Sequence, residues 1–253
     1  MSLKYSDKAH RYWLDGKPVP GVTTILGKGI PKPALPYWSA RVVAEYVADN
    51  PESVEALRAA GRDPMVAALK SQPWVERDEA AVRGTDVHAL AEIVVHGGAA
   101  EVPEHLLARV EGYVAWLDEF DVHPILTEKS VASRQHRYAG RFDFIGTIGA
   151  LGDETWLLDW KTSKGVYGET ALQTAAYALA EFYVEDGAPD VEIPLPRIDR
   201  IGVVHVTEHG STLHDLGTPA EAFPHFLAAK AVADGLAFRE SIVSAPVILP
   251  EAS

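Results

Sequence analysis

The chain has 253 residues, a formal net charge of −13 and no cysteine. The lack of cysteine excludes disulfides, thiolate zinc sites and cysteine-ligated iron–sulfur clusters, and the acidic balance argues against a protein that coats nucleic acid non-specifically. No apolar run reaches about 18 residues, so we expect no membrane span. We expect a globular protein, because 47% of the residues are hydrophobic and 23% are charged. A cytoplasmic location is expected as well, since the absence of cysteine is compatible with a reducing compartment.

A hairpin is predicted near the start of the chain. Residues 5–14 and 17–26 flank Asp15 and Gly16, a dipeptide typical of two-residue hairpin turns. A proline-rich connector follows, and the hydrophobic spacing beyond it predicts helices. Their expected ranges are 37–48, 51–70 with a break near Gly61 and Pro64, 78–95 and 103–120.

The middle of the chain changes to the alternation that is typical of strands. The expected strands are 125–132, 138–148 and 155–161, with a turn at 149–153. A helix over 169–184, a hairpin of 201–206 and 212–216, and a last helix over 219–238 follow. This order indicates an α/β (α+β) fold. We divide it into an N-terminal hairpin and helical region (1–75), a core (76–243) and a C-terminal tail (244–253).

Two of these strands carry the polar residues with the clearest chemistry. Strand alternation places Asp159 and Lys161 on one face of 156–161, and Asp143 on one face of 138–148. The opposite faces are hydrophobic, and the alternation assigns to them Trp156, Leu158 and Trp160 in one strand, and Phe142 and Phe144 in the other. If the two strands are neighbours, two carboxylates and a lysine converge over a hydrophobic floor.

This cluster has the composition of a site for a hard divalent cation. Mg²⁺ prefers oxygen ligands and commonly uses only one or two protein carboxylates, which Asp143 and Asp159 supply. The backbone carbonyl of Trp160 is a candidate third oxygen. Lys161 would then position an attacking water or stabilise charge on a phosphate. The alternative is an exposed ion pair between Asp159 and Lys161, worth about 0–1 kcal/mol.

Gln173 and Tyr177 are four residues apart in the next predicted helix and therefore share a face. The core-facing residues of that helix are predicted to be Leu172, Ala176, Leu179 and Tyr183. We therefore expect Gln173 and Tyr177 at the rim beside the metal site, where they would contact a phosphate or hold Lys161. The alternative is one surface amide and one half-buried tyrosine.

A second cluster lies in the predicted helix 78–95. His88 and Glu92 are one turn apart, so either could ligate a metal or orient the other, although a lone helical histidine is more often structural. Glu128 is a weaker candidate ligand. The remaining histidines show no spacing typical of a metal site. Four basic residues are candidates for DNA contact: Arg83, Arg137, Arg141 and Lys164.

Four short motifs, taken in order, resemble the PD-(D/E)XK nuclease superfamily and its RecB-like branch. They are R-G-T-D-V-H (83–88), G-R-F-D (140–143), L-D-W-K-T (158–162) and Q-T-A-A-Y (173–177). The segment V-T-T-I-L (22–26) followed by Trp38 is similar to phage-encoded relatives. Phe142 stands where the superfamily has proline. The iron–sulfur cysteines of some relatives are absent, which leaves the phage exonuclease-like members as the nearest type.

The resemblance implies a restriction-endonuclease-like core with a mixed central sheet flanked by helices. It assigns His88, Asp143 and Asp159 to an Mg²⁺ or Mn²⁺ ion and Lys161 to catalysis, with Gln173 and Tyr177 in a supporting motif. It implies DNA as the partner, and the host cytoplasm as the location if the protein is phage-encoded. The resemblance is also compatible with a homo-oligomer or with a recombination partner protein.

The expected function is that of a metal-dependent deoxyribonuclease, in the first place an exonuclease acting on DNA ends or single strands in phage-type recombination, replication or repair. Two alternatives remain open. One is a non-catalytic DNA-end-binding or protein-binding module on the same scaffold, which the acidic net charge favours. The other is a structure-selective endonuclease built on the same core.

Overall fold

The computed structural model describes residues 2–6, 11–95 and 102–246; within 79–95 it describes the backbone and the side chains of Leu90 and Ile93. It contains a seven-stranded mixed sheet flanked by helices and a small three-stranded N-terminal sheet. The predicted α/β architecture is therefore confirmed. None of the helices among the described residues is both long and apolar enough to cross a membrane.

The central sheet has the strand order β10-β9-β6-β5-β4-β7-β8. Every neighbouring pair is antiparallel except β6 and β9, which run parallel. The strands are β4 (Val122–Ser133), β5 (Tyr138–Ile148), β6 (Gly152–Lys161), β7 (Phe182–Val184), β8 (Ile193–Pro194), β9 (Arg200–Thr207) and β10 (Gly210–Asp215). A short 3-10 turn, η2 (Gly149–Leu151), connects β5 to β6.

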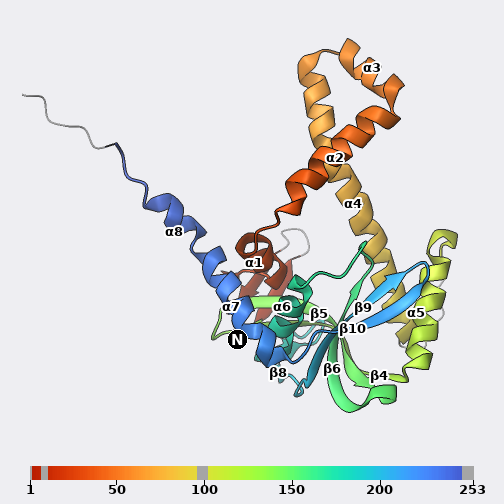
Figure 1. The fold of residues 1–253 in the computed structure, drawn as a ribbon. Helices are drawn as coiled ribbons and strands as arrows, with labels where there is room; N and C mark the ends of the chain where they lie inside the picture. The colour runs from red at the N-terminus through yellow and green to blue at the C-terminus, as the bar shows by residue number, and fades with distance from the viewer. Residues whose placement is uncertain (1, 7–10, 96–101, 247–253) are drawn as a thin grey trace, which may run out of the picture.

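Helices cover both faces of this sheet (Figure 1). One face packs against α1 (Val22–Gly29), α6 (Glu169–Ala178) and α7 (Pro219–Asp234), and α8 (Leu236–Ser241) continues from α7. The other face packs against α5 (Leu107–Glu119), which follows η1 (Glu104–Leu106), and against the end of α4 (Arg62–Val95). The helices on the two sides therefore bury apolar residues on both faces of the central strands.

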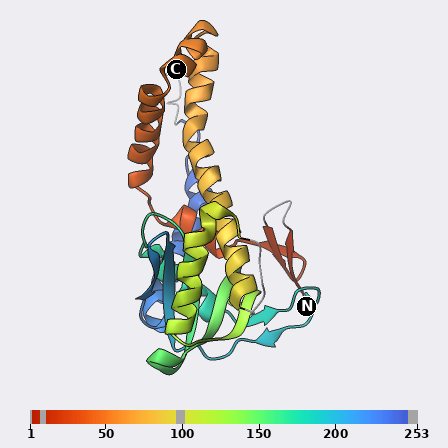
Figure 2. The same ribbon diagram turned by 90° about the vertical axis from the view of Figure 1, so that its right-hand side faces the viewer.

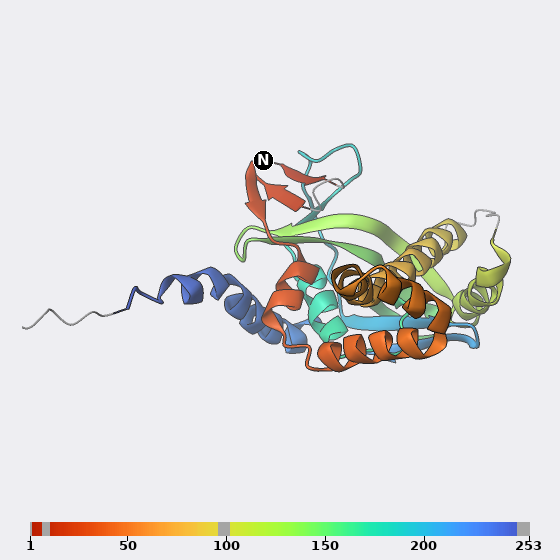
Figure 3. The same cartoon turned by 90° about the horizontal axis from the view of Figure 1, so that it is seen from above.

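Helices α2 (Ala34–Asp49), α3 (Pro51–Ala59) and the first part of α4 form an arm that projects away from the sheet (Figures 1 and 2), and Figure 3 views it from above. The arm has little interior, since Val42 is the buried residue of α2 and Val54 that of α3. Helix α3 ends before Gly61, whose φ of +105° is a conformation that glycine adopts readily.

The N-terminal sheet contains β1 (Leu3–Ser6), β2 (Arg11–Leu14) and β3 (Lys17–Val19). The predicted hairpin turn is confirmed, because β2 pairs with β3 and both Asp15 (φ +52°) and Gly16 (φ +74°) have positive φ. The second arm is shorter than predicted: it ends at Val19, and residues 22–26 form a helix. Arg134 joins this sheet to the central sheet through an ion pair with Asp15 (2.9 Å).

The buried residues of β6 alternate between the two faces, as predicted. Trp156, Leu158 and Trp160 pack with α5, while Leu157 packs with α6 and α7. The predicted common face of Phe142 and Phe144 is wrong. Phe142 packs in the α6–α7 cluster and Phe144 in the α5 cluster. The switch of faces between Phe142 and Phe144 occurs at Asp143. Glu128 lies opposite Asp143 in the β4–β5 register, and its φ of +50° interrupts the ladder there.

Several predicted helix ranges differ from the structure. The predicted break near Gly61 separates α3 from α4, but residues 62–70 and the predicted range 78–95 belong to the same helix, because α4 continues through Pro73 as one helix of 34 residues. The boundary at 75/76 therefore lies inside α4. The predicted helix 169–184 ends at Ala178, and Phe182–Val184 forms β7, which pairs with β4. Residues 182–184 are aromatic and β-branched, so pairing with β4 competes well with helix extension.

Candidate active site

Two of the predicted metal-binding residues, Asp143 and Asp159, meet where the ladder between β5 and β6 ends. The last regular pair of this ladder toward the site is Phe144 with Leu158. Beyond it, the backbone N–H of Trp160 donates to Asp143 Oδ2 (2.8 Å). The Asp143 carboxylate thus replaces the strand carbonyl as the acceptor, so the buried N–H of Trp160 keeps a hydrogen-bond partner. This bond brings Asp143 to the strand that carries Asp159 and Lys161.

Asp159 is buried, with 2% of its surface exposed. Lys161 Nζ lies 2.5 Å from Asp159 Oδ2, and Gln173 Nε2 donates to Asp159 Oδ1 (2.8 Å). The predicted common face of Asp159 and Lys161 is confirmed, and the alternative of an exposed ion pair is wrong. The Lys161 ammonium is therefore the close partner of Asp159 Oδ2, and the short distance establishes the ion pair.

The supporting pair from α6 reaches the same carboxylate. Gln173 Nε2 also donates to the Tyr177 hydroxyl (3.3 Å), so Tyr177, Gln173 and Asp159 form a chain. Gly140 permits this arrangement, because a Cβ at that position would lie 2.3 Å from Tyr177 Cε1. The expectation of a rim position is wrong for Tyr177, which is 3% exposed.

The predicted core-facing residues of this helix are confirmed in part. Ala176 and Tyr183 are buried, and Leu172 packs against the same cluster. The buried residues of α6 are Thr170, Thr174, Ala175, Ala176, Tyr177 and Ala178. Leu179 lies just after the helix and is 41% exposed. The small residues of this face let α6 approach the sheet closely, and that approach brings Gln173 within reach of Asp159. Leu179 is therefore the predicted core-facing residue that the structure contradicts.

The charges of the cluster influence one another. Burial lowers the pKa of Lys161, but Asp159 and then Asp143 and Glu169 oppose this, and the pKa is raised overall. Lys161 therefore stays an ammonium. Burial, followed by the charges of Asp159 and Asp143, raises the pKa of Tyr177, which therefore stays a neutral hydroxyl.

Tyr113 of α5, which lies in the predicted helix 103–120, is a neighbour of the site. Its ring packs edge-on against Trp160 (5.2 Å between centroids), and burial, followed by the charge of Asp143, raises its pKa. Its hydroxyl is buried and has no hydrogen-bond partner among the described residues. Helical spacing predicts that Tyr113 is buried, but nothing in the sequence indicates that it lies near Asp143.

Glu128 and Arg141 bind each other. Arg141 Nε donates to Glu128 Oε2 (2.8 Å), and a second nitrogen of Arg141 lies 3.7 Å from Asp186. The weaker candidate ligand and one candidate DNA contact are thus joined in an ion pair. The β4–β5 register places them beside Asp143, since Lys129 pairs with Phe142.

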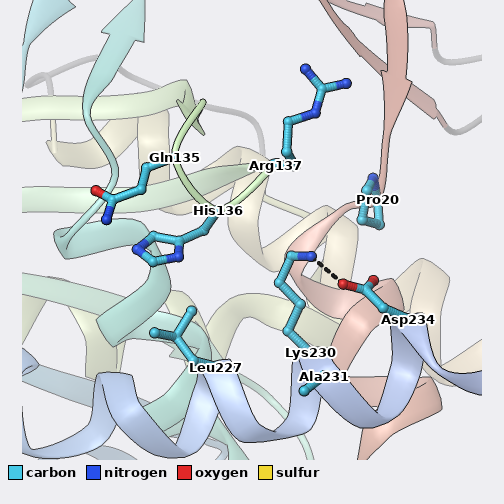
Figure 4. A pocket seen from close by; sticks show the side chains of 8 residues that line it. All are labelled: Pro20, Gln135, His136, Arg137, Leu227, Lys230, Ala231 and Asp234. Atoms are coloured by element: carbon cyan, nitrogen blue, oxygen red, sulfur yellow. Dashed lines mark hydrogen bonds and ion pairs between the residues drawn. The ribbon is translucent and has the colours of Figure 1, made fainter.

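The other candidate residues lie apart from the cluster. Lys164 is exposed, three residues after Lys161. Arg137 is exposed and contributes to an open pocket of about 580 Å³ (Figure 4), which is lined by Pro20, Gln135, His136, Arg137, Leu227, Lys230, Ala231 and Asp234. This pocket contains none of the predicted metal-binding residues. The side chains of Arg83, His88 and Glu92 lie in the part of α4 outside the described side chains.

The residues present fit a hard divalent cation with few protein ligands. Among the described residues, no group of three or more His, Cys, Asp or Glu side chains is arranged to hold a metal ion. Asp143 accepts from the strand that carries Asp159, and Asp159 Oδ2 is a buried carboxylate oxygen paired with the Lys161 ammonium. Mg²⁺ keeps several waters and is commonly held by one or two carboxylates, so this donor set suits it.

Comparison with known proteins gives no family assignment: no protein-family model matches the chain, and no curated protein matches it significantly.

Proposed function

We propose that the chain is a metal-dependent deoxyribonuclease, in the first place an exonuclease that hydrolyses phosphodiester bonds at DNA ends or in single strands. The observation that carries this proposal is the cluster of Asp143, Asp159 and Lys161 at the end of the β5–β6 ladder. Gln173 and Tyr177 support the cluster, in the motif order that resembles the PD-(D/E)XK superfamily. Phage-type recombination, replication or repair is the proposed setting.

The roles of the residues follow from their chemistry. Asp143 and Asp159 provide hard oxygen ligands for Mg²⁺ or Mn²⁺. Such an ion, when bound, supplies Lewis-acid activation of phosphate and water. Lys161 has a raised pKa and therefore acts as a fixed positive charge toward a phosphate, not as a base. Gln173 fixes the orientation of Asp159 through the bond to Oδ1.

The first test is cleavage of end-labelled linear DNA with Mn²⁺ by wild-type protein and by Lys161→Ala. Loss of the positive charge should lower the cleavage rate by roughly a hundredfold or more. Lys70→Ala is the matched control, since Lys70 is an exposed lysine of α4. Circular dichroism establishes that each variant is folded. A Lys161→Ala protein that cleaves DNA at the wild-type rate would overturn the proposed mechanism.

A closed circular DNA distinguishes the exonuclease from the structure-selective endonuclease. An exonuclease needs an end, so circular DNA should remain intact under conditions in which linear DNA is degraded. Cleavage of the circle would assign the protein to the endonuclease alternative while leaving the chemistry of the site unchanged.

A non-catalytic DNA-end-binding or protein-binding module is the second candidate. Two observations favour it: the net charge of −13, and the presence of only paired carboxylates, without a third acidic or histidine ligand, among the described residues. This candidate predicts a folded wild-type protein that degrades none of the DNA substrates with Mg²⁺ or Mn²⁺.

A further inference from the structure

His205 of β9 lies beside Lys161 in the central sheet. Strands β6 and β9 are parallel, and Lys161 and His205 are register partners. Paired residues of neighbouring strands project on the same face of a sheet, so His205 shares the face of Lys161 and Asp159. This face is the one that α6 covers.

The imidazole of His205 is bonded to the segment that follows Lys161. Its Nε2 lies 2.6 Å from the carbonyl oxygen of Ser163. A carbonyl oxygen only accepts hydrogen bonds, so Nε2 carries the proton and donates. Nε2 is protonated in one neutral tautomer and in the imidazolium, so the ring holds this bond in either protonation state.

Ser163 belongs to the connection that joins the two halves of the candidate site. Residues 162–168 run from Lys161 at the end of β6 to α6, which supplies Gln173. Within this connection, the Ser163 hydroxyl donates to the Gly165 carbonyl (2.8 Å). The bond from His205 therefore fixes the connection close to Lys161, at the segment that also presents Lys164.

We propose that His205 is a positioning residue of this site. It acts through the Ser163 carbonyl: the bond holds residues 162–165 so that Lys161 stays against Asp159 and Lys164 is presented to the DNA strand. The role in the reaction rests on the proposed nuclease function. The restraint on residues 162–165 does not depend on that function.

The restraint is tested by trypsin, which cleaves after Lys164 when the segment opens. The variants are His205→Thr, whose side chain suits a strand but is too short to reach Ser163, and His205→Gln, whose amide nitrogen can donate in place of Nε2. Loss of one hydrogen bond should speed cleavage after Lys164 by roughly three- to tenfold in His205→Thr. His205→Gln should remain near the wild-type rate.

His209→Ala is the control, because His209 is an 86% exposed histidine in the turn between β9 and β10. Mass spectrometry identifies the bond that is cleaved, and circular dichroism establishes folding. If trypsin cleaves His205→Thr after Lys164 at the wild-type rate, the proposal is overturned. Equal acceleration in His205→Thr and His205→Gln would also overturn it, since the donor would then be irrelevant.

DNA cleavage separates this proposal from the proposed function. His205→Thr should lower kcat/KM by roughly tenfold, and His205→Gln should restore most of the loss, because a mispositioned site reacts more slowly. Faster trypsin cleavage with unchanged kcat/KM would refute the role in the reaction. If no variant cleaves DNA, wild type included, the nuclease function fails, while the trypsin result still decides whether His205 restrains the segment.

Discussion

Asp143 accepts the backbone N–H of Trp160 at 2.8 Å, so one candidate metal-binding carboxylate also completes the hydrogen bonding of the strand that carries the other. The same side chain therefore has a structural and a proposed chemical role. These roles can be separated, because an asparagine oxygen still accepts the N–H but is a poorer metal ligand than a carboxylate.

Asp143→Ala leaves the Trp160 N–H without this acceptor and should lower the free energy of unfolding by about 1–3 kcal/mol. Asp143→Asn should keep most of that stability and lose DNA cleavage. Chemical denaturation of both variants, alongside the DNA assay, makes the comparison. Equal destabilisation by the two substitutions would show that the bond to Trp160 contributes little.

Gln173 stabilises a buried carboxylate. In Gln173→Leu, Asp159 Oδ1 loses the donor at 2.8 Å, and the expected loss of stability is about 1–3 kcal/mol. Gln72→Leu is the control, because its amide bonds the backbone carbonyl of Ala68 on the arm (3.2 Å) and no charge depends on it. Thermal unfolding of both variants measures the difference. A smaller effect for Gln173 than for Gln72 would contradict the geometry described.

Gly140 should be intolerant of even one added methyl group. Its Cβ would lie 2.3 Å from Tyr177 Cε1, and moving Tyr177 disturbs Gln173. Gly140→Ala should therefore destabilise the fold by about 1–3 kcal/mol and lower DNA cleavage. Gly27→Ala is the control, since a Cβ there meets no atom within 4 Å and alanine favours the helix. A Gly140→Ala protein as stable and active as wild type would exclude the close contact.

Arg134 should make stability depend on pH through its two carboxylate partners. It bonds Asp15 and Glu192, and these bonds hold both carboxyl pKa values below their ordinary values of 3.8 and 4.5. A lowered folded pKa contributes stability that is present above the ordinary pKa and is lost as the pH falls through the folded value.

Arg134→Met keeps an apolar side chain near the Phe182 ring and removes the charge. The stability difference between wild type and this variant should be largest near neutral pH and shrink below about pH 4.5. Denaturation between about pH 3 and pH 7 measures it. If the stability difference between wild type and Arg134→Met grows as the pH falls, the predicted role of the Arg134 ion pairs is contradicted.

Local patterns predicted much of the fold, because they depend on neighbouring residues. The Asp15-Gly16 turn and the face shared by Trp156, Leu158 and Trp160 follow from turn chemistry and strand alternation. Alternation wrongly placed Phe142 and Phe144 on the same face. The regular ladder is interrupted at Asp143, opposite Glu128 of the neighbouring strand, which has a positive φ. An alternation pattern contains no information on a distortion that arises in another strand.

The sequence predicted which residues form the candidate site better than it predicted how they are arranged. The ion pair of Asp159 and Lys161 follows from their positions two apart in one strand. The burial of Tyr177 does not follow from local sequence, because the ring needs the space that glycine leaves at position 140. The places of Tyr113 and His205 depend on how α5 packs and on the β6–β9 register, both of which are long-range contacts.

The most direct test of the central claim is a calorimetric titration of the protein with Mn²⁺ in the absence of DNA. We predict binding to the wild-type protein at millimolar or lower concentration, and a loss of at least tenfold in affinity in Asp143→Asn and in Asp159→Asn. The control Asp153→Asn changes an exposed carboxylate at the other end of β6 and should bind as wild type does. A wild-type protein that binds no Mn²⁺, or two site variants that bind it as tightly as wild type, would contradict a metal site at these carboxylates.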